Sequence, residues 1–461
     1  MATKRKALGR KGPSRPREAL LVEGGTLVTC DAGDRVIPGD LLAVDGRIEA
    51  MGDGARAVGE GTGLLRVLRA QGCAVVPGFV QAHVHLCQVL FRGMADDLPL
   101  LDWLRERIWP LEAAHDERSL RASAELGLLE MTLAGTTTIL DMGTVHGHDA
   151  VFDACARSGV RAISGKTMMD SGEGVPAGLR ESTRASLAES DALFARWNGA
   201  AEGRLGYAYG PRFILSCTEQ LFREVVQRAR ENGALLHSHA AEHPAERDAV
   251  RRILGADDVD VLERWGFCGE RAILAHGVQL TDAQGRRAAE LGTRFVHCPS
   301  ANLKLGSGIA RVQALLDLGV RLALGADGAP CNNNLDPFME LRLAALLAKI
   351  TSGTTSLPAR RALRLSTIDG AVALGLGDQV GSLEVGKRAD LAVVRLDGAH
   401  SEPGGDLFSR LVYACKSSDV VHVVVDGRVL VKNGEHQLLD RERVVRTAGS
   451  EGRRAAARAG L

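Results

Sequence analysis

Short apolar runs with the length and composition of buried strands recur along the middle of the chain. The intervals between them, such as 119–134 and 219–233, repeat apolar residues at the spacing of an amphipathic helix. Strands that alternate with helices in this way predict an α/β fold, a parallel (β/α)8 barrel over residues 77–375. An open, doubly wound sheet is the alternative, but no GxGxxG motif follows the first strand. The runs span 78–85, 135–143, 161–170, 204–211, 234–242, 272–278, 294–300 and 321–328.

Both ends of the chain have a different pattern, in which β-type runs are separated by glycine-rich turns. We expect residues 19–76 and 376–445 to pair into one small β-sandwich domain, although the whole barrel separates them in sequence. Residues 1–18 are rich in Lys and Arg and predict a disordered basic tail, and the Arg/Ala-rich segment 446–461 predicts a flexible one. The runs lie at 19–30, 40–52, 73–80, 381–397 and 419–435.

Polar side chains gather where the predicted strands end, which is the end of a barrel that carries catalytic residues. Two histidines one residue apart follow the first run, and on an extended backbone their rings point to the same side. Taken alone, such a pair is weak evidence for a metal ion. Together the strand ends contribute His83 and His85 (first), His237, His239 and Glu242 (fifth), His276 (sixth), His297 (seventh) and Asp327 (eighth).

These residue types suit a metal-dependent hydrolase. Imidazole nitrogens and a carboxylate form a ligand set for zinc or ferrous iron. A metal ion of this kind lowers the pKa of a bound water, so that a nucleophile exists near neutral pH. An aspartate beside that water can accept its proton, and a nearby glutamate can protonate the substrate. The set therefore indicates hydrolytic attack on an sp² carbon.

The longer motifs around these residues resemble the amidohydrolase superfamily. They are "PGFVQAHVHL", "HSHAAE", "LAHGV", "CPSANLKLGSGIA" and "LGADGAPCNNNLDPFMELRLAALL", in this order along the chain. Within the superfamily they are most similar to the aminohydrolases that deaminate S-adenosylhomocysteine, methylthioadenosine or 5'-deoxyadenosine, and to triazine hydrolases. The resemblance extends over nearly the whole chain, including the split β-sandwich.

The resemblance implies a role for each residue at a matching position. Glu242 is a proton shuttle that also holds a ring nitrogen of the base, and His276 hydrogen-bonds the hydrolytic water or the developing intermediate. Asp327 doubles as metal ligand and general base, while His237 packs beside a ligand or supports it. One divalent metal ion, zinc by preference and iron as the alternative, is bound by His83, His85, His239 and Asp327.

A second metal ion is not expected. The binuclear branch of the superfamily uses a carbamylated lysine as a bridge, and the fourth run, "RLGYAYGP", contains no lysine. Lys166 lies on the third run instead, and we interpret it as structural or substrate-facing.

Two positions bear on the identity of the substrate. Glu112 matches the glutamate that binds the ribose hydroxyls in the nucleoside deaminases, and a carboxylate accepts both hydrogens of a cis-diol. Arg212 stands where those relatives commonly have histidine, and its stretch "PRFILSC" is similar to guanine deaminases. An arginine only donates hydrogen bonds and suits a carbonyl oxygen such as O6 of guanine.

Other residues near these motifs carry less information. Trp103 and Trp109 provide an apolar wall or belong to the core. Cys87 and Gln88 are expected to line the pocket. No motif fixes whether Arg180, Arg184 or Ser300 contacts substrate.

Composition excludes several other classes of function. Lys+Arg equals Asp+Glu at 57 each, so the chain has no general attraction for nucleic acid or an anionic membrane. No apolar run is long enough to predict a membrane span. The nine cysteines follow no CxxC spacing, which argues against disulfides and for a reducing, cytoplasmic location.

We therefore predict a hydrolytic deaminase of a purine nucleoside, with 5'-deoxyadenosine or a related 5'-modified adenosine as substrate. A guanine or 8-oxoguanine deaminase and a triazine (chloro)hydrolase are the alternatives. Glu242 favours deamination, because an amine leaving group needs a proton more than chloride does. A non-catalytic scaffold is disfavoured because every ligand and proton-handling position is filled. The expected partners are a small purine and, in a homo-oligomer, further copies of the chain.

Overall fold

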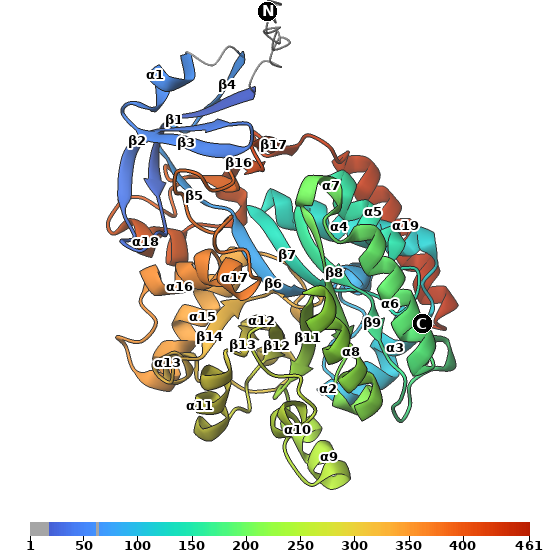
Figure 1. Ribbon diagram of the computed structural model, residues 1–461. Helices are drawn as coiled ribbons and strands as arrows, with labels where there is room; N and C mark the ends of the chain where they lie inside the picture. Colours follow the sequence, from blue (N-terminus) through green and yellow to red (C-terminus); the bar gives the residue numbers. More distant parts are fainter. Residues whose placement is uncertain (1–17, 61–63) are drawn as a thin grey trace, which may run out of the picture.

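The predicted barrel is confirmed by the computed structural model, which describes residues 18–60 and 64–461. The basic residues 1–17 lie outside the described residues. Eight strands pair in parallel, and a bridge between Val84 and Asp327 brings the last strand back to the first (Figure 1). They are β6 (Phe79–Val84), β7 (Thr136–Met142), β8 (Arg161–Gly165), β10 (Leu205–Pro211), β11 (Leu235–Ala240), β12 (Ala272–His276), β13 (Arg294–His297) and β14 (Arg321–Leu324). A two-residue strand, β9 (Thr167–Met168), adds to β10.

The barrel closes where β14 passes close to the histidine pair. Every residue of β6 is buried, as expected for a strand that is covered on both faces. Gly325 follows β14, and a Cβ there would lie 2.6 Å from the carbonyl oxygen of His83. Because no larger residue fits, glycine allows the backbone of the eighth strand to reach that of the first.

Helices cover the outside of the barrel. In α8 (Glu219–Asn232), buried residues recur at helical spacing from Leu221 to Ala229, and Thr218 caps the first turn. The other helices between strands are α4 (Glu117–Leu133), α5 (Asp149–Ser158), α6 (Thr183–Trp197), α7 (Ala200–Gly203), α9 (Pro244–Leu254), α10 (Asp258–Arg264), α11 (Asp282–Leu291), α12 (Pro299–Lys304) and α13 (Val312–Asp317). After β14 follow α14 (Ala329–Asn332), α15 (Pro337–Ser352), α16 (Ala359–Leu365) and α17 (Ile368–Ala373).

The two ends of the chain meet in a separate mixed sheet, as predicted. Strand β15 from the C-terminal part pairs antiparallel with β5, which joins the two halves (Figure 1). The strands are β1 (Glu18–Val28), β2 (Val36–Val44), β3 (Arg47–Gly52), β4 (Leu64–Arg69), β5 (Cys73–Pro77), β15 (Leu391–Arg395), β16 (Val420–Val425), β17 (Arg428–Lys432) and β18 (Glu435–His436). Two short helices, α1 (Ala55–Glu60) and α18 (Leu407–Ser409), accompany them.

The expectation of a flexible tail at 446–461 is wrong. These residues form most of α19 (Arg441–Arg458), which lies against α4 (Figure 1). Ala448 and Ala455 are buried in one cluster with Leu90 and Phe91. Alanine has high helix propensity, and its small side chain lets the helix pack closely, so an Arg/Ala-rich segment is ordered once a partner surface exists.

A short irregular segment follows the histidine pair and lies over the end of the barrel. It contains the 3₁₀ helix η1 (Leu86–Phe91), α2 (Leu100–Trp103), the π-helical turn η2 (Leu104–Ile108) and α3 (Trp109–Ala113). Single π-helical turns are frequent at functional sites. Across the described residues, no helix combines the length and apolar character that a membrane crossing requires.

Candidate metal centre and active site

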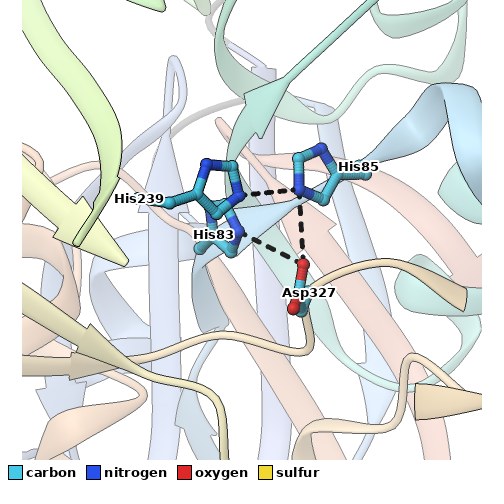
Figure 2. Close-up of side chains that lie close together, drawn as sticks. All are labelled: His83, His85, His239 and Asp327. Carbon is cyan, nitrogen blue, oxygen red and sulfur yellow. Dashed lines mark hydrogen bonds and ion pairs between the residues drawn. The ribbon is translucent and has the colours of Figure 1, made fainter. Parts of the chain in front are cut away.

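Four of the predicted ligand residues come together at the carboxyl end of the barrel (Figure 2). His83 is in β6 and His85 directly follows it, His239 is in β11, and Asp327 follows β14. One donor atom from each residue lies within 4.8 Å of all the others. The barrel therefore assembles a compact ligand set from residues that are 244 positions apart.

The atoms that face one another are the ones a metal ion would use. His83 Nε2 and His85 Nε2 lie 3.2 and 3.3 Å from Asp327 Oδ1, and His85 Nε2 lies 3.2 Å from His239 Nε2 (Figure 2). Among the described residues, buried His83 Nε2 has no hydrogen-bond partner. A buried nitrogen of this kind loses free energy unless an ion or another group pairs with it. The arrangement fits a metal ion.

The outer ring nitrogens fix which nitrogen points inward. His85 Nδ1 lies 2.8 Å from the carbonyl oxygen of Met142, and His239 Nδ1 lies 2.8 Å from that of Arg212. A carbonyl oxygen only accepts, so each Nδ1 donates its hydrogen and each Nε2 keeps a free lone pair. His83 Nδ1 is 2.9 Å from His237 Nε2, which places His237 beside a candidate ligand. Metal-binding histidines are held in this way by hydrogen bonds from the other nitrogen.

The protonation states also favour a cation. Burial lowers the pKa of His85 to about 3 and that of His239 well below its ordinary value, so both rings are neutral. Burial alone would raise the pKa of Asp327, but the imidazole of His83 beside it holds that pKa well below the ordinary value. Neutral imidazoles around an ionised carboxylate form a site of negative charge.

Two of the candidate active-site residues have a strained backbone. His276 has φ 78° and Asp327 has φ 63°, in the left-handed region that residues with a Cβ rarely adopt. Strain of this kind persists where surrounding structure enforces it and is concentrated at functional sites. Here it turns both side chains toward the cavity at the end of the barrel.

Glu242 and His276 form a second pair beside the four residues. His276 Nε2 lies 3.4 Å from Glu242 Oε2 and 4.0 Å from Asp327 Oδ2. Its Nδ1 lies 2.9 Å from Asn302 Oδ1 and donates to it, which leaves a lone pair at Nε2. Burial lowers the pKa of His276 to about 4, whereas burial together with Glu246 and Asp327 raises the pKa of Glu242 well above its usual range. The pair thus combines a neutral imidazole with a protonated carboxyl group.

One cavity connects these residues. Its walls include apolar side chains from the segment after β6 and from the loops that follow β10 and β13, and its enclosed space is about 20 Å³. It is lined by His85, Gln88, Leu100, Trp103, Leu104, Arg212, Phe213, His239, Glu242, His276, Leu305 and Asp327.

Glu112 and Arg212, both predicted to bind substrate, are bonded to each other. Arg212 donates from Nη1 to Glu112 Oε2 at 2.5 Å and from Nη2 to Oε1 at 3.2 Å, and Gln88 donates to Oε1 at 2.8 Å. Burial alone would raise the pKa of Glu112, but the charge of Arg212 and its hydrogen bonds lower it. Arg212 and Gln88 line the cavity and Glu112 lies behind them. The glycine at 328 leaves room for Gln88, since a Cβ there would lie 2.1 Å from its Oε1.

All but one of the remaining predicted residues lie apart from the cavity. Trp103 lines it, whereas Trp109 is packed in the core. The Cys87 thiol points to the carbonyl oxygen of Gly143, and His297 is buried at the end of β13. Arg180 binds the carbonyl oxygen of Gly172. Arg184 is exposed and Ser300 binds Glu340.

Two contributions were not anticipated from the sequence. Asn302 orients His276, and Met142 orients His85 through its backbone carbonyl. Asn302 lies inside the motif "CPSANLKLG", so its position after the seventh strand was a usable signal. The contribution of Met142 could not be found in this way, because every residue has a backbone carbonyl and the sequence does not show which one is used.

A second group with metal-ligating composition surrounds Lys166, and its members lie in the loop after β7, just before α6 and within α6. His146, Glu181 and Glu189 have donor atoms within 4.8 Å of one another. Lys166 is fully buried between them, and its Nζ lies 2.5 Å from a carboxylate oxygen of each glutamate. The single ammonium group already pairs with both carboxylates, and Lys166 therefore has a structural role here.

A hydrolase-type barrel with a His/Asp metal-binding site is the class that this fold and site define. The Amidohydrolase family matches residues 74–430, and the chain belongs to that family. It is 39% identical over 439 residues to the 5-methylthioadenosine/S-adenosylhomocysteine deaminase of Halobacterium salinarum, covering 95% of each chain. It is 37% identical to the 5'-deoxyadenosine deaminase of Methanosarcina acetivorans, covering 94% of this chain and 98% of that one.

A solved structure agrees with these relatives. An adenosine deaminase from Xanthomonas campestris with bound zinc is 31% identical, with a TM-score of 0.87, over 95% of this chain and 98% of that chain. The predicted similarity to the deaminase branch of the amidohydrolases is thereby confirmed.

Proposed function

We propose that the protein is a metal-dependent deaminase of a 5'-modified adenosine, such as 5'-deoxyadenosine, methylthioadenosine or S-adenosylhomocysteine. The observation that carries the proposal is the convergence of four ligand atoms, a protonated Glu242 and a neutral His276 at one cavity. The similarity to deaminases of these substrates over most of the chain supports it.

The metal ion is proposed to be held by His83, His85, His239 and Asp327. Three neutral imidazoles and one carboxylate are ligands that zinc prefers, and a related structure contains zinc. When bound, the ion lowers the pKa of a water molecule and so supplies the nucleophile. Because Lys166 occupies the other group with suitable side chains, we propose a single metal ion per chain.

The protons are proposed to be handled by three side chains around the reacting carbon. Glu242 carries a proton near neutral pH and donates it to a ring nitrogen of the purine, which makes the adjacent carbon a better electrophile. His276 accepts a hydrogen from the attacking water through Nε2 and orients it. Asp327 Oδ2 takes the proton of that water and passes it to the departing amine, which leaves as ammonia. The remaining proton of the new hydroxyl group returns to Glu242, so the product is the oxo form of the purine and Glu242 is protonated again.

Arg212 is proposed to contact the substrate directly, with Glu112 as its positioning residue. Both oxygens of Glu112 already accept hydrogen bonds from Arg212 or Gln88, and only the latter two side chains line the cavity. A guanidinium group donates to acceptor atoms of the substrate. This arrangement favours ribose or ring acceptors in a nucleoside and also suits O6 of guanine, so guanine deamination is the second candidate.

The covering segment must move for a purine to enter. About 20 Å³ is room for little more than one water molecule. Leu100, Trp103 and Leu104 form the movable side, because they belong to the irregular segment between β6 and α4. We infer that this segment shifts outward for binding and closes over the substrate.

A substrate panel tests the proposal. Ammonia release by zinc-loaded protein is measured with 5'-deoxyadenosine, methylthioadenosine, S-adenosylhomocysteine, guanine and 8-oxoguanine, and chloride release is measured with a chlorotriazine. We expect kcat/KM to be highest for one of the three nucleosides. Turnover of guanine alone, or of the chlorotriazine alone, would overturn the assignment.

The role of Arg212 is tested with matched variants. Arg212→Met and Glu112→Gln should lower kcat/KM for the preferred purine about 10–100-fold, the cost of one or two charged hydrogen bonds. The metal content of both variants should stay at the wild-type value. Unchanged kcat/KM in Arg212→Met would remove Arg212 from the substrate site.

We also propose a cytoplasmic location. All nine cysteines are free and eight of them are buried, as in proteins of a reducing compartment. A homo-oligomer stays a prediction, which sedimentation of the purified protein tests.

A further inference from the structure

A second, larger cavity lies at the opposite end of the barrel from the candidate metal centre. It has a volume of about 420 Å³, and its lining includes the residues that begin or precede β8, β10, β12 and β13. This volume falls in the range of small-molecule sites, about 300–1,000 Å³. Arg161, Arg204, Arg271 and Arg294 all contribute to its walls.

Arg161 is neutralised within the protein. Its Nε and Nη2 donate to the two carboxylate oxygens of Asp390 at 2.9 and 3.1 Å, and Asp426 lies 3.8 Å away. Both Asp390 and Asp426 belong to the C-terminal part of the mixed sheet. This buried group joins the sheet to the barrel and leaves no charge for a ligand.

Arg204 and Arg294 have no such partner. They are 5% and 9% exposed, and neither forms an ion pair with any of the described residues. Each donates one hydrogen bond to a backbone carbonyl, from Arg204 to Val160 at 3.0 Å and from Arg294 to Ala373 at 2.9 Å. The Nε atom of each is buried without a hydrogen-bond partner in the described part of the chain.

Buried guanidinium groups without counter-ions are costly. An isolated buried charge loses several kcal/mol of solvation unless an opposite charge compensates it. Arg428 and Arg161 act on Arg204 with like charge, and the more weakly acting Asp426 and Glu202 offset them in part. Arg321 acts on Arg294 with like charge, and Glu270 acts on it with opposite charge. Glu270 also lines the cavity, but it is exposed and forms no ion pair with the described residues, so it offsets the positive charge only in part.

We propose that this cavity binds a phosphate-bearing small molecule, whose phosphate is held by Arg204 and Arg294. A guanidinium group has planar, parallel N–H donors that match the oxygens of a phosphate. A phosphate monoester carries about two negative charges near neutral pH, which compensates two buried guanidinium groups where a single carboxylate compensates one. The free volume beyond the phosphate accommodates the rest of a small metabolite.

Calorimetric titration of the full-length protein tests the proposal. The probes are inorganic phosphate and ribose 5-phosphate, with potassium chloride at matched ionic strength as the blank. We expect saturable binding of about one probe per chain, tighter for the ester if the cavity holds the remainder of the molecule. Equal affinity for both probes would assign the site to the free ion, and no saturable binding of either would overturn the proposal.

Matched variants separate ligand binding from structural roles. Arg204→Gln and Arg294→Gln should each weaken binding at least about tenfold, the value of one charged hydrogen bond. Arg286→Gln is the control, because Arg286 is exposed in α11 and does not line the cavity. Binding that survives in both cavity variants, or falls equally in the control, would contradict the assignment.

Thermal unfolding distinguishes ligand binding from a purely structural role of the two arginines, because only ligand binding makes Tm depend on phosphate. If the two arginines only cap backbone carbonyls, their replacement lowers Tm by the same amount with and without phosphate. The proposal predicts that phosphate raises Tm in the wild type and in Asp327→Asn, but not in Arg294→Gln. A phosphate effect that disappears in Asp327→Asn would place the anion at the metal centre instead.

Discussion

Among the residues that the structure describes, two groups of side chains have the composition of a metal site, and they differ in whether their lone pairs are already used by the protein. In each group the donor atoms lie within 4.8 Å of one another. At His83, His85, His239 and Asp327, the outer ring nitrogens are bonded and the inner lone pairs are free to face an ion. In the group of His146, Glu181 and Glu189, the ammonium of Lys166 already pairs with both carboxylates.

The difference teaches that closeness of ligating residues does not define a metal site. What matters is whether their lone pairs are already used by the protein. Four changes test this comparison, and they are ordered by the size of the effect expected on ammonia release.

Removal of one ligand should have the largest effect. His239→Gln should lose the bound metal and slow ammonia release by about 10⁴-fold, because the ion contributes several kcal/mol to the transition state. Metal analysis and an ammonia assay on the same preparation check both parts. His400→Gln is the control, since His400 binds Asp419 in the C-terminal part of the chain, outside the group. A fully active, metal-loaded His239→Gln would exclude this ligand set.

Loss of the proton donor should have the next largest effect. Glu242→Gln cannot deliver a proton to the ring, and general acid catalysis contributes about 10²–10⁴-fold. We expect kcat to fall on the order of 10³-fold while the metal content stays at the wild-type value. A variant that lost metal as well would show that Glu242 supports the ligands rather than the chemistry.

Loss of the hydrogen bond that orients His276 should have a moderate effect on kcat. Asn302→Leu removes the acceptor of His276 Nδ1, so the ring can adopt the other tautomer and lose its inward lone pair. A hydrogen bond of about 1 kcal/mol corresponds to a decrease in kcat of roughly fivefold. Steady-state kinetics on the metal-loaded variant measures this, and an unchanged kcat would mean that the orientation of His276 is fixed by other contacts.

Replacement of Lys166, which pairs with Glu181 and Glu189, should have the smallest effect on catalysis. Lys166→Met should release ammonia at close to the wild-type rate, but its free energy of unfolding should fall by about 3–5 kcal/mol, because Glu181 is left buried and unpaired. With excess zinc, the variant should bind a second ion where the wild type does not. A second ion in the wild type would show that Lys166 does not block this group.

Much of the fold could be predicted because the barrel strands carry local signals. Runs such as 135–143 and 272–278 consist mostly of apolar or β-branched residues, and each contains a glycine or polar residue near its end. His83 and Asp327 were recognisable because each lies near the end of such a run, and strand ends in a barrel converge on one site. The positions of these two side chains in space depend on how the strands are arranged in the barrel. The alternation of predicted strands and helices had already indicated that arrangement.

The features that could not be predicted depend on contacts between distant residues. The pairing of Glu112 with Arg212 joins the segment after β6 to the end of β10. Nothing in the sequence around either residue indicates that the two side chains bind each other. Helix α19 was expected to be flexible because its exposed face is rich in arginine, whereas Ala448 and Ala455 are buried by a surface elsewhere in the chain. The cavity with Arg204 and Arg294 likewise appears only when strand starts are brought together.

The most direct test of the central claim combines metal content with activity in one experiment. The purified protein is analysed for bound metal, stripped with a chelator, and titrated with zinc while ammonia release from 5'-deoxyadenosine is followed. We predict about one equivalent of metal as purified, no activity after stripping, and full recovery at one equivalent of zinc. Full activity in the stripped protein, or recovery that requires a second equivalent, would contradict a single metal ion at these four residues.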